Sequence, residues 1–330
     1  MRSPISLHPM LRSVLGLAVV SVFQACDGGG TFDPAGESTS EPQSAPSVSA
    51  PAESFAALTT SQRLAFTESG PSVYTMDLQG SQRVALFTHL PGARSPAWSW
   101  DNTKLAMVSA RASNGVTHDD IVVMNADGTN DHWARTQASA FDFQDPTWAP
   151  NGSRIVMTVL YGGVPTLGWV EPGTSNAGLF FVPGGGAILG KRPSFNKAGT
   201  RLLYVGEHGN TIEQVNADGS GHKVRISSTS ALDYPSFSPD GSRIAYQKGP
   251  AGGNTDVFVK NLTTGATTRL TFSTAADGHP SWSPDGARIA FTSKRTGKLQ
   301  IYSMKSATGG DLVHVSKETY ADQYDPAWTH

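Results

Sequence analysis

The stretch PSWSPDGARIAF, residues 280–291, decides the fold, because close copies of it recur elsewhere in the chain. It joins a Pro-small-aromatic segment to a Ser-Pro-Asp-Gly turn, which leads into a short apolar strand. Proline presets φ at the second turn position, and glycine tolerates the left-handed conformation at the fourth. A distinctive motif that recurs in this way indicates repeated architecture rather than a single active site.

The copies follow a regular period. They start at Pro96, Pro146, Pro193, Pro235 and Pro280, and a partial copy, PAWTH, starts at Pro326. Successive starts are 50, 47, 42, 45 and 46 residues apart. A repeat period in the forties is typical of the blades of a β-propeller.

Each repeat can be divided into four short strands. The Pro-x-aromatic segment is the first, and the Arg-Ile-Ala-Phe/Tyr segment, apolar on both faces, is the second. Strands of this kind are expected where each sheet is packed between two others. Segments such as 256–265, a third strand with its turn, and 267–272, a fourth strand, complete the repeat, and the turn residues around them favour strands over helix.

The first unit lacks its first strand. Residues 63–69, RLAFTES, have the pattern of a second strand, and residues 73–80 and 83–89 complete the unit. PAWTH at the other end of the chain is the missing strand, and its pairing there removes two exposed sheet edges. The sequence therefore predicts an all-β domain over residues 58–330, a six-bladed propeller of four-stranded antiparallel blades closed by the C-terminal strand.

The first 26 residues have the pattern of a secretory signal. Arg2 and Arg12 precede an apolar run of about ten residues, which is too short to span a bilayer. The run ends beside Cys26, the only cysteine of the chain, in a context that resembles a bacterial lipobox. We expect Cys26 to be lipidated; the alternative is an ordinary cleaved signal with an incidental cysteine.

Residues 27–57 are rich in Ser, Pro, Gly and Ala and contain no Lys or Arg. Such a segment buries too little apolar surface to offset its ordering entropy, so we expect a disordered tether. The two N-terminal segments together predict a protein that is secreted across the inner membrane. We expect it on the periplasmic or cell-surface face, with membrane contact only through the lipid anchor.

Composition and motifs exclude several classes of function. The formal net charge is −2 and only 16% of residues are charged, which argues against a nucleic-acid partner. No Gly-x-Ser-x-Gly elbow is present, which counts against a serine peptidase. No spacing of His or Cys matches a zinc site, so we expect no metal and no cofactor, and we expect a monomer.

The W/F-S-P-D-G-x-R-I-A-F pattern, with third strands that lead into turns such as Asn-Ala-Asp-Gly, resembles the propeller repeats of TolB, the periplasmic component of the Tol-Pal envelope system. The resemblance covers roughly residues 63–330. It implies a non-catalytic scaffold that binds a protein or peptide of the cell envelope. The same repeat also occurs in peptidases related to prolyl oligopeptidase and in oligogalacturonate lyases.

The residues just before the repeat prolines differ from one unit to the next. The first strand of a blade lines the central channel, so these residues are expected to surround one channel mouth. The candidate binding residues are Arg94, Asp145, Arg192, Asp233, Tyr234, Asp277, His279 and Asp325. Two interpretations stay open: the aspartates satisfy local backbone donors, or the mouth binds a partner segment or a cation through converging carboxylates.

Two alternatives to the scaffold also stay open. Propeller lyases that resemble oligogalacturonate lyase gather several histidines around a metal at the channel, whereas His279 is the histidine expected near this mouth. A metal-dependent polysaccharide lyase is therefore the weaker alternative, and we expect no enzyme. A sensor of a small ligand would use the same mouth, and the sequence does not separate it from the scaffold.

Overall fold

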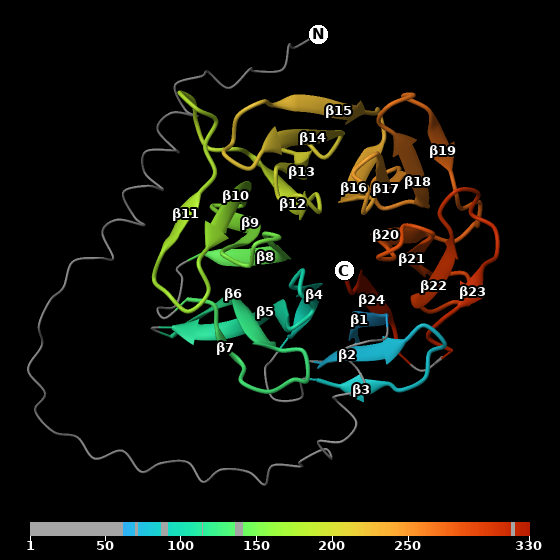
Figure 1. The fold of residues 1–330 in the computed structure, drawn as a ribbon, viewed down its shortest axis with the longest axis horizontal. Helices are drawn as coiled ribbons and strands as arrows, with labels where there is room; N and C mark the ends of the chain where they lie inside the picture. Colours follow the sequence, from blue (N-terminus) through green and yellow to red (C-terminus); the bar gives the residue numbers. More distant parts are fainter. Residues whose placement is uncertain (1–61, 70–71, 87–91, 114, 136–140, 318–320) are drawn as a thin grey trace, which may run out of the picture. The chain divides into compact units, whose positions relative to one another are not determined.

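The computed structural model describes residues 62–330 apart from 70–71, 87–91, 114, 136–140 and 318–320. The signal segment with Cys26 and the tether, predicted for residues 1–57, lie outside the described residues. The described chain forms six four-stranded antiparallel sheets arranged as blades around a central axis (Figure 1). Within this part of the chain, no helix has the length and apolar character needed to span a bilayer.

The strands of the described residues have between two and ten residues each. In chain order they are β1 (Arg63–Glu68), β2 (Ser72–Asp77), β3 (Val84–Ala85), β4 (Arg94–Trp98), β5 (Lys104–Ser113), β6 (Val116–Asn125), β7 (His132–Trp133), β8 (Asp142–Trp148), β9 (Ile155–Tyr161), β10 (Val164–Val170), β11 (Ala177–Leu179), β12 (Gly190–Phe195), β13 (Arg201–Gly206), β14 (Thr211–Asn216), β15 (Lys223–Ser227), β16 (Ala231–Phe237), β17 (Arg243–Gly249), β18 (Asp256–Asn261), β19 (Thr267–Arg269), β20 (Asp277–Trp282), β21 (Arg288–Ser293), β22 (Gln300–Lys305), β23 (Val313–His314) and β24 (Gln323–Trp328).

Blade 1 is built from both ends of the propeller sequence. Its strand order is β24-β1-β2-β3, while blades 2 to 6 take four consecutive strands each, from β4–β7 to β20–β23. β24 pairs antiparallel with β1, with Leu64 opposite Trp328 and Glu68 opposite Gln323. The prediction of six blades closed by the C-terminal strand is confirmed. β4, β8, β12, β16, β20 and β24 are the innermost strands and surround the central channel (Figure 1).

The second strand of each blade is buried because both of its faces meet a neighbouring blade. In β1, Leu64 packs in one apolar cluster with Ala290 and Ile301 of blade 6. The next residue, Ala65, packs in another cluster with Trp98 and other residues of blade 2. This arrangement explains why the second strands are apolar at consecutive positions rather than at alternate ones.

The Ser-Pro-Asp-Gly turn is held by its own side chains. Ser283 Oγ donates to Asp285 Oδ1 at 2.6 Å and accepts the backbone N–H of Arg288 at 2.9 Å. Asp285 Oδ1 also accepts the backbone N–H of Ala287 at 2.9 Å. Gly286 has a φ of +67°, as the sequence pattern predicts for the fourth turn position.

In blades 4 and 5 the arginine of the repeat contacts the next blade. The guanidinium of Arg243, in blade 5, lies 4.6 Å from the ring centre of Trp282 in blade 6 and donates to the carbonyl oxygen of Gly286 at 3.4 Å. Arg201 stacks in the same way on Phe237, one blade earlier. A cation over an aromatic face adds a polar contact to the apolar contact between blades.

Truncation of the last inner strand tests the closure. Trp328 is 3% exposed and packs against Leu64 and Phe66 of β1. Trp328→Ala is expected to lower the free energy of unfolding by about 3–5 kcal/mol, because it leaves a large cavity at the seam. Phe272→Ala, at a residue that is 72% exposed, should change it by less than about 0.5 kcal/mol. Denaturant unfolding of both variants measures the difference; equal values would contradict this role of β24.

Candidate functional site

One residue in each inner strand has an unusual backbone conformation. It is the residue directly before the repeat proline, and its φ lies between 49° and 55° in every blade. A residue before proline normally adopts an extended conformation, and few residues other than glycine have a positive φ. These six residues, called the pre-proline ring below, are Ser95, Asp145, Arg192, Tyr234, His279 and Asp325.

The conformation belongs to a β-bulge that recurs in all six blades. In blade 2, for example, the pairing of β4 with β5 shifts register between Arg94 and Ala97, on either side of Ser95. The displaced backbone N–H groups find side-chain acceptors on second strands: that of Ser95 donates to Thr67 Oγ1 at 3.1 Å. That of Arg192 donates to Thr158 Oγ1 at 3.0 Å. The bulge turns one side chain per blade toward the channel axis without leaving these donors unpaired.

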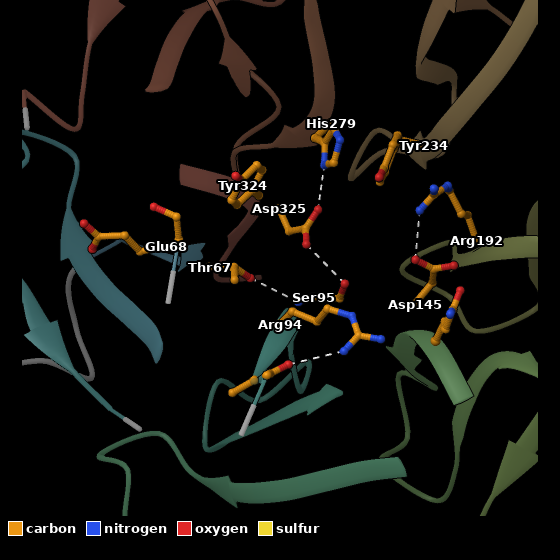
Figure 2. Close-up of a pocket in the computed structure, with 14 residues that line it drawn as sticks. Thr67, Glu68, Arg94, Ser95, Asp145, Arg192, Tyr234, His279, Tyr324 and Asp325 are labelled. Carbon is orange, nitrogen blue, oxygen red and sulfur yellow. Dashed lines mark hydrogen bonds and ion pairs between the residues drawn. The ribbon is translucent and has the colours of Figure 1, made fainter. Parts of the chain in front are cut away.

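The ring side chains contact one another in sequence around the channel (Figure 2). Arg192 Nη1 donates to Asp145 Oδ1 at 2.9 Å, and its guanidinium lies 3.8 Å from the ring centre of Tyr234. The Tyr234 ring stacks on His279, with ring centres 3.6 Å apart. His279 Nδ1 lies 2.6 Å from Asp325 Oδ1. Ser95 donates its hydroxyl to the other oxygen of Asp325 at 3.1 Å.

This chain of contacts divides the channel into two cavities. The mouth cavity, of about 500 Å³, lies on the side where the inner strands begin, and Gln144, Arg94 and Tyr324 also line it. A second cavity, of about 200 Å³, lies on the other side and is lined by the repeat prolines and by Trp98 and Trp328. All six ring residues line both cavities, so the ring forms the boundary between them.

Burial and charge act together on the ring carboxylates. Burial raises the pKa of Asp145, although the charge of Arg192 opposes this. Burial would also raise the pKa of Asp325, but the hydrogen bonds from His279 and Ser95 and the charge of Arg192 lower it below its ordinary value. Burial would lower the pKa of Arg192, but the charge of Asp145 outweighs it and raises that pKa.

Most residues predicted from the sequence meet at the mouth. Arg94 and five ring members (Asp145, Arg192, Tyr234, His279 and Asp325) line the mouth cavity. Asp233 lies behind them, where it pairs with Arg192 Nε. Arg94 is held at the rim by an ion pair with Asp119 of β6.

Asp277 corrects the predicted set. It is 1% exposed, and both of its carboxylate oxygens accept hydrogen bonds from Arg295 at 3.1–3.2 Å. The third residue before the proline is buried in every repeat, and Phe143 and Leu232 occupy the position of Asp277 in two of the others. Asp277 and His279 are two residues apart and would share one face of a regular strand. The β-bulge between Gly278 and Ser281 separates them, and only His279 lines the mouth cavity.

Sequence reasoning missed Ser95 and Gln144, which the structure places at the mouth, whereas Tyr324 is expected there from its position before Pro326. Ser95 occupies the same pre-proline position as the other five ring residues. Its place directly before Pro96 is the feature that identifies Ser95 as a ring residue, because the ring is defined by position and not by residue type. Among the described residues, no group of three or more His, Cys, Asp or Glu side chains is placed to hold a metal ion.

Removal of the Arg192 guanidinium tests how far it offsets the charges of Asp145 and Asp233. Arg192→Met leaves Asp145 and Asp233 without their shared partner and is expected to cost about 3 kcal/mol of stability near neutral pH. The pKa of Asp145 would rise further above its unfolded value. The deficit should therefore shrink as the pH falls from neutral toward about 4, the range of an unfolded carboxyl, because a protonated carboxyl needs no counter-charge.

A matched change at an exposed ion pair is the control for that measurement. Arg154 lies 3.6 Å from Glu171, and both side chains are about one third exposed or more. Arg154→Met should cost less than about 1 kcal/mol at any pH. Denaturant unfolding of both variants at several pH values checks the pair of expectations, and a deficit for Arg192→Met that grows in acid would contradict them.

Known proteins that resemble this chain share its propeller fold. The sequence model described as the TolB beta propeller domain matches residues 24–252 and 193–330. No curated protein matches the sequence. Among solved structures, TolB from Acinetobacter baumannii is 19% identical with a TM-score of 0.66, and the match covers 81% of this chain and 66% of that one.

Two further structures show how widely this fold is used. A protein from Agrobacterium tumefaciens described as TolB is 16% identical with a TM-score of 0.57, over 77% of this chain and 88% of that one. An oligogalacturonate lyase in complex with manganese is 13% identical with a TM-score of 0.50, over 74% of this chain and 70% of that one. At these identities the likeness shows the fold alone.

Proposed function

The chain belongs to the TolB β-propeller domain family, and from this premise we propose that it is a non-catalytic scaffold of the cell envelope whose mouth cavity binds a segment of a protein partner. The observation that carries the proposal is the identity of the six ring residues. Each holds a positive φ, which costs on the order of 1–3 kcal/mol for a residue other than glycine. Glycine would remove this strain, yet no blade has it there.

The ring side chains also differ from blade to blade, although the surrounding repeat does not. Each ring position comes directly before a repeat proline and has the same backbone conformation, yet the six residues are Ser, Asp, Arg, Tyr, His and Asp. A purely structural position in a repeat would favour one residue type in all copies. Retained strain together with varied chemistry supports a recognition surface built from one side chain per blade.

The mouth cavity suits a short polar segment. Its volume of about 500 Å³ falls within the usual range for ligand sites, and several polypeptide side chains fit in it. The lining combines aromatic rings, carboxylates, guanidinium groups and the amide of Gln144. Aromatic and arginine side chains are the residues that most often dominate binding energy at protein interfaces.

We further propose that the propeller acts as a monomer held at a membrane by lipidated Cys26, on the periplasmic or cell-surface face. The signal-like first 26 residues and the lipobox-like context of Cys26 support this part of the proposal. The tether of residues 27–57 would give the domain room to meet its partner. A small-ligand sensor would use the same cavity, so the size of the captured molecule separates the two functions.

Obstruction of the cavity tests partner binding. In a double variant, Gln144→Trp and Tyr324→Trp, two indole rings would fill space at the mouth while the pre-proline ring stays intact. Proteins captured from envelope extract by the wild type should be depleted at least about tenfold, because a blocked pocket loses its central contacts. Quantitative mass spectrometry of the captured proteins measures this.

The control adds the same two indole rings elsewhere. Val224→Trp and Val313→Trp place them on the outer strands β15 and β23, at residues that are 51% and 38% exposed. This variant should capture the same proteins as the wild type. Equal capture by the mouth variant and the outer-strand variant would place partner binding elsewhere on the molecule.

Lipidation has a direct chemical test. Cells that express the protein are grown with an alkyne-tagged fatty acid, and the purified protein is then reacted with an azide dye. The wild type should carry the label and Cys26→Ala should not, because no other cysteine is present to accept the lipid. An unlabelled wild-type protein would show that Cys26 belongs to an ordinary signal.

The lyase alternative has less support from the site. In the described lining of the mouth cavity, His279 is joined by no second histidine. Its Nδ1 already bonds Asp325. The fold likeness to a manganese-bound lyase concerns the propeller and not these side chains.

A further inference from the structure

The charges that line the mouth cavity are almost all matched by permanent partners. Glu68 pairs with Arg83, and Arg94 pairs with Asp119. Asp145 shares the Arg192 guanidinium with Asp233, which lies behind the ring. These arginines stay protonated at any physiological pH, so each matched carboxylate is already neutralised by a cation.

Asp325 differs from the other carboxylates of the described lining. Its partners are the imidazole of His279, 2.6 Å away, and the hydroxyl of Ser95, 3.1 Å away. An imidazole is the side chain whose charge changes near neutral pH. When His279 is neutral, Asp325 keeps two hydrogen bonds but has no cation in direct contact with it.

The hydrogen bond to Asp325 also fixes which nitrogen of His279 carries the proton. A carboxylate only accepts, so Nδ1–H donates to it and Nε2 of the neutral ring is an acceptor. Protonation converts Nε2 into a donor and gives Asp325 a full counter-charge. The two states of His279 therefore present opposite chemistry to an incoming group: neutral His279 accepts beside an unmatched carboxylate, whereas charged His279 donates beside a matched one.

The groups that face His279 come from four neighbouring strands. Asp325 of β24 and the Tyr234 ring of β16 contact it directly, and Gln247 of β17 accepts its backbone N–H at 3.3 Å. Arg192 of β12 lies on the far face of Tyr234 and is matched by Asp145 and Asp233. Among these groups, the balance of charge at Asp325 depends on the proton of His279.

We propose that the mouth cavity receives a positively charged side chain of the partner at Asp325, and that this cation competes with the proton of His279. The inference rests on the proposed function and names the chemistry of the bound segment as a lysine or arginine side chain. Its cationic group would donate to Asp325 and to Nε2 of neutral His279. Tyr324, which also lines the cavity, adds an aromatic ring that favours a cation.

Two model peptides of opposite charge test the inference on the purified full-length protein. N-acetyl-trilysine amide and N-acetyl-triglutamate amide are titrated into it by calorimetry at about pH 8 and about pH 5, on either side of the usual histidine range. The basic peptide should bind at least about tenfold more tightly at the higher pH, since a charged imidazole repels a second cation. The acidic peptide should not bind at either pH.

Two substitutions separate the roles of the pair. His279→Asn keeps an amide N–H for Asp325, tolerates the positive φ and does not titrate, so its affinity for the basic peptide should be the same at both pH values. Asp325→Asn removes the anion and should weaken binding at least about tenfold at about pH 8. Asp218→Asn, at an exposed turn carboxylate, is the matched control and should bind as the wild type does.

Each result decides one of the two proposals. Absence of basic-peptide binding, tighter binding in acid, or a pH dependence that persists in His279→Asn would overturn the inference. The His279→Asn result stands without Asp325→Asn, so a folding defect in the latter leaves the test intact. If the tryptophan variant at the mouth still abolishes partner capture while the basic peptide fails to bind, the proposed function holds and the cationic ligand is wrong.

Discussion

The pairing of β24 with β1 is the contact on which the rest of the propeller depends. Every blade buries both faces against its neighbours, so no blade has a stable surface of its own to present to solvent. Without that one seam, two blade faces and two strand edges would be exposed together. The channel and its mouth exist only because the ring of blades is closed, and within the pre-proline ring the contact of Ser95 with Asp325 crosses that seam.

Within the closed ring of blades, the backbone geometry is repeated while the chemistry of the side chains at the pre-proline ring varies. The apolar second strand recurs in each blade and packs against both neighbours, and it supplies much of the stability. The β-bulge before each proline is repeated as well, but it only aims a side chain and does not specify which one. Function can therefore vary at the ring while the packing between blades stays constant.

The sequence predicts the architecture well because a repeated motif shows the same local physics several times. Six blades and the closing strand follow from the spacing of prolines and from one missing first strand. The site is predicted less well because strand register decides it. Asp277 and His279 stand two residues apart, and an added bulge residue sends one between blades and the other to the channel. Ser95 carries no chemical signal that distinguishes it from other serines, so only its position before Pro96 identifies it.

The boundary formed by the pre-proline ring gives the molecule two unequal ends. A group that enters at the mouth meets charged and aromatic side chains, while the second cavity is lined by the repeat prolines and by Trp98 and Trp328. The mouth cavity is therefore a socket whose chemistry differs from that of the cavity behind it. Because each blade supplies one wall of that socket, exchange of a single repeat would alter one wall and leave the other five, which makes stepwise divergence of binding preference compatible with an unchanged fold.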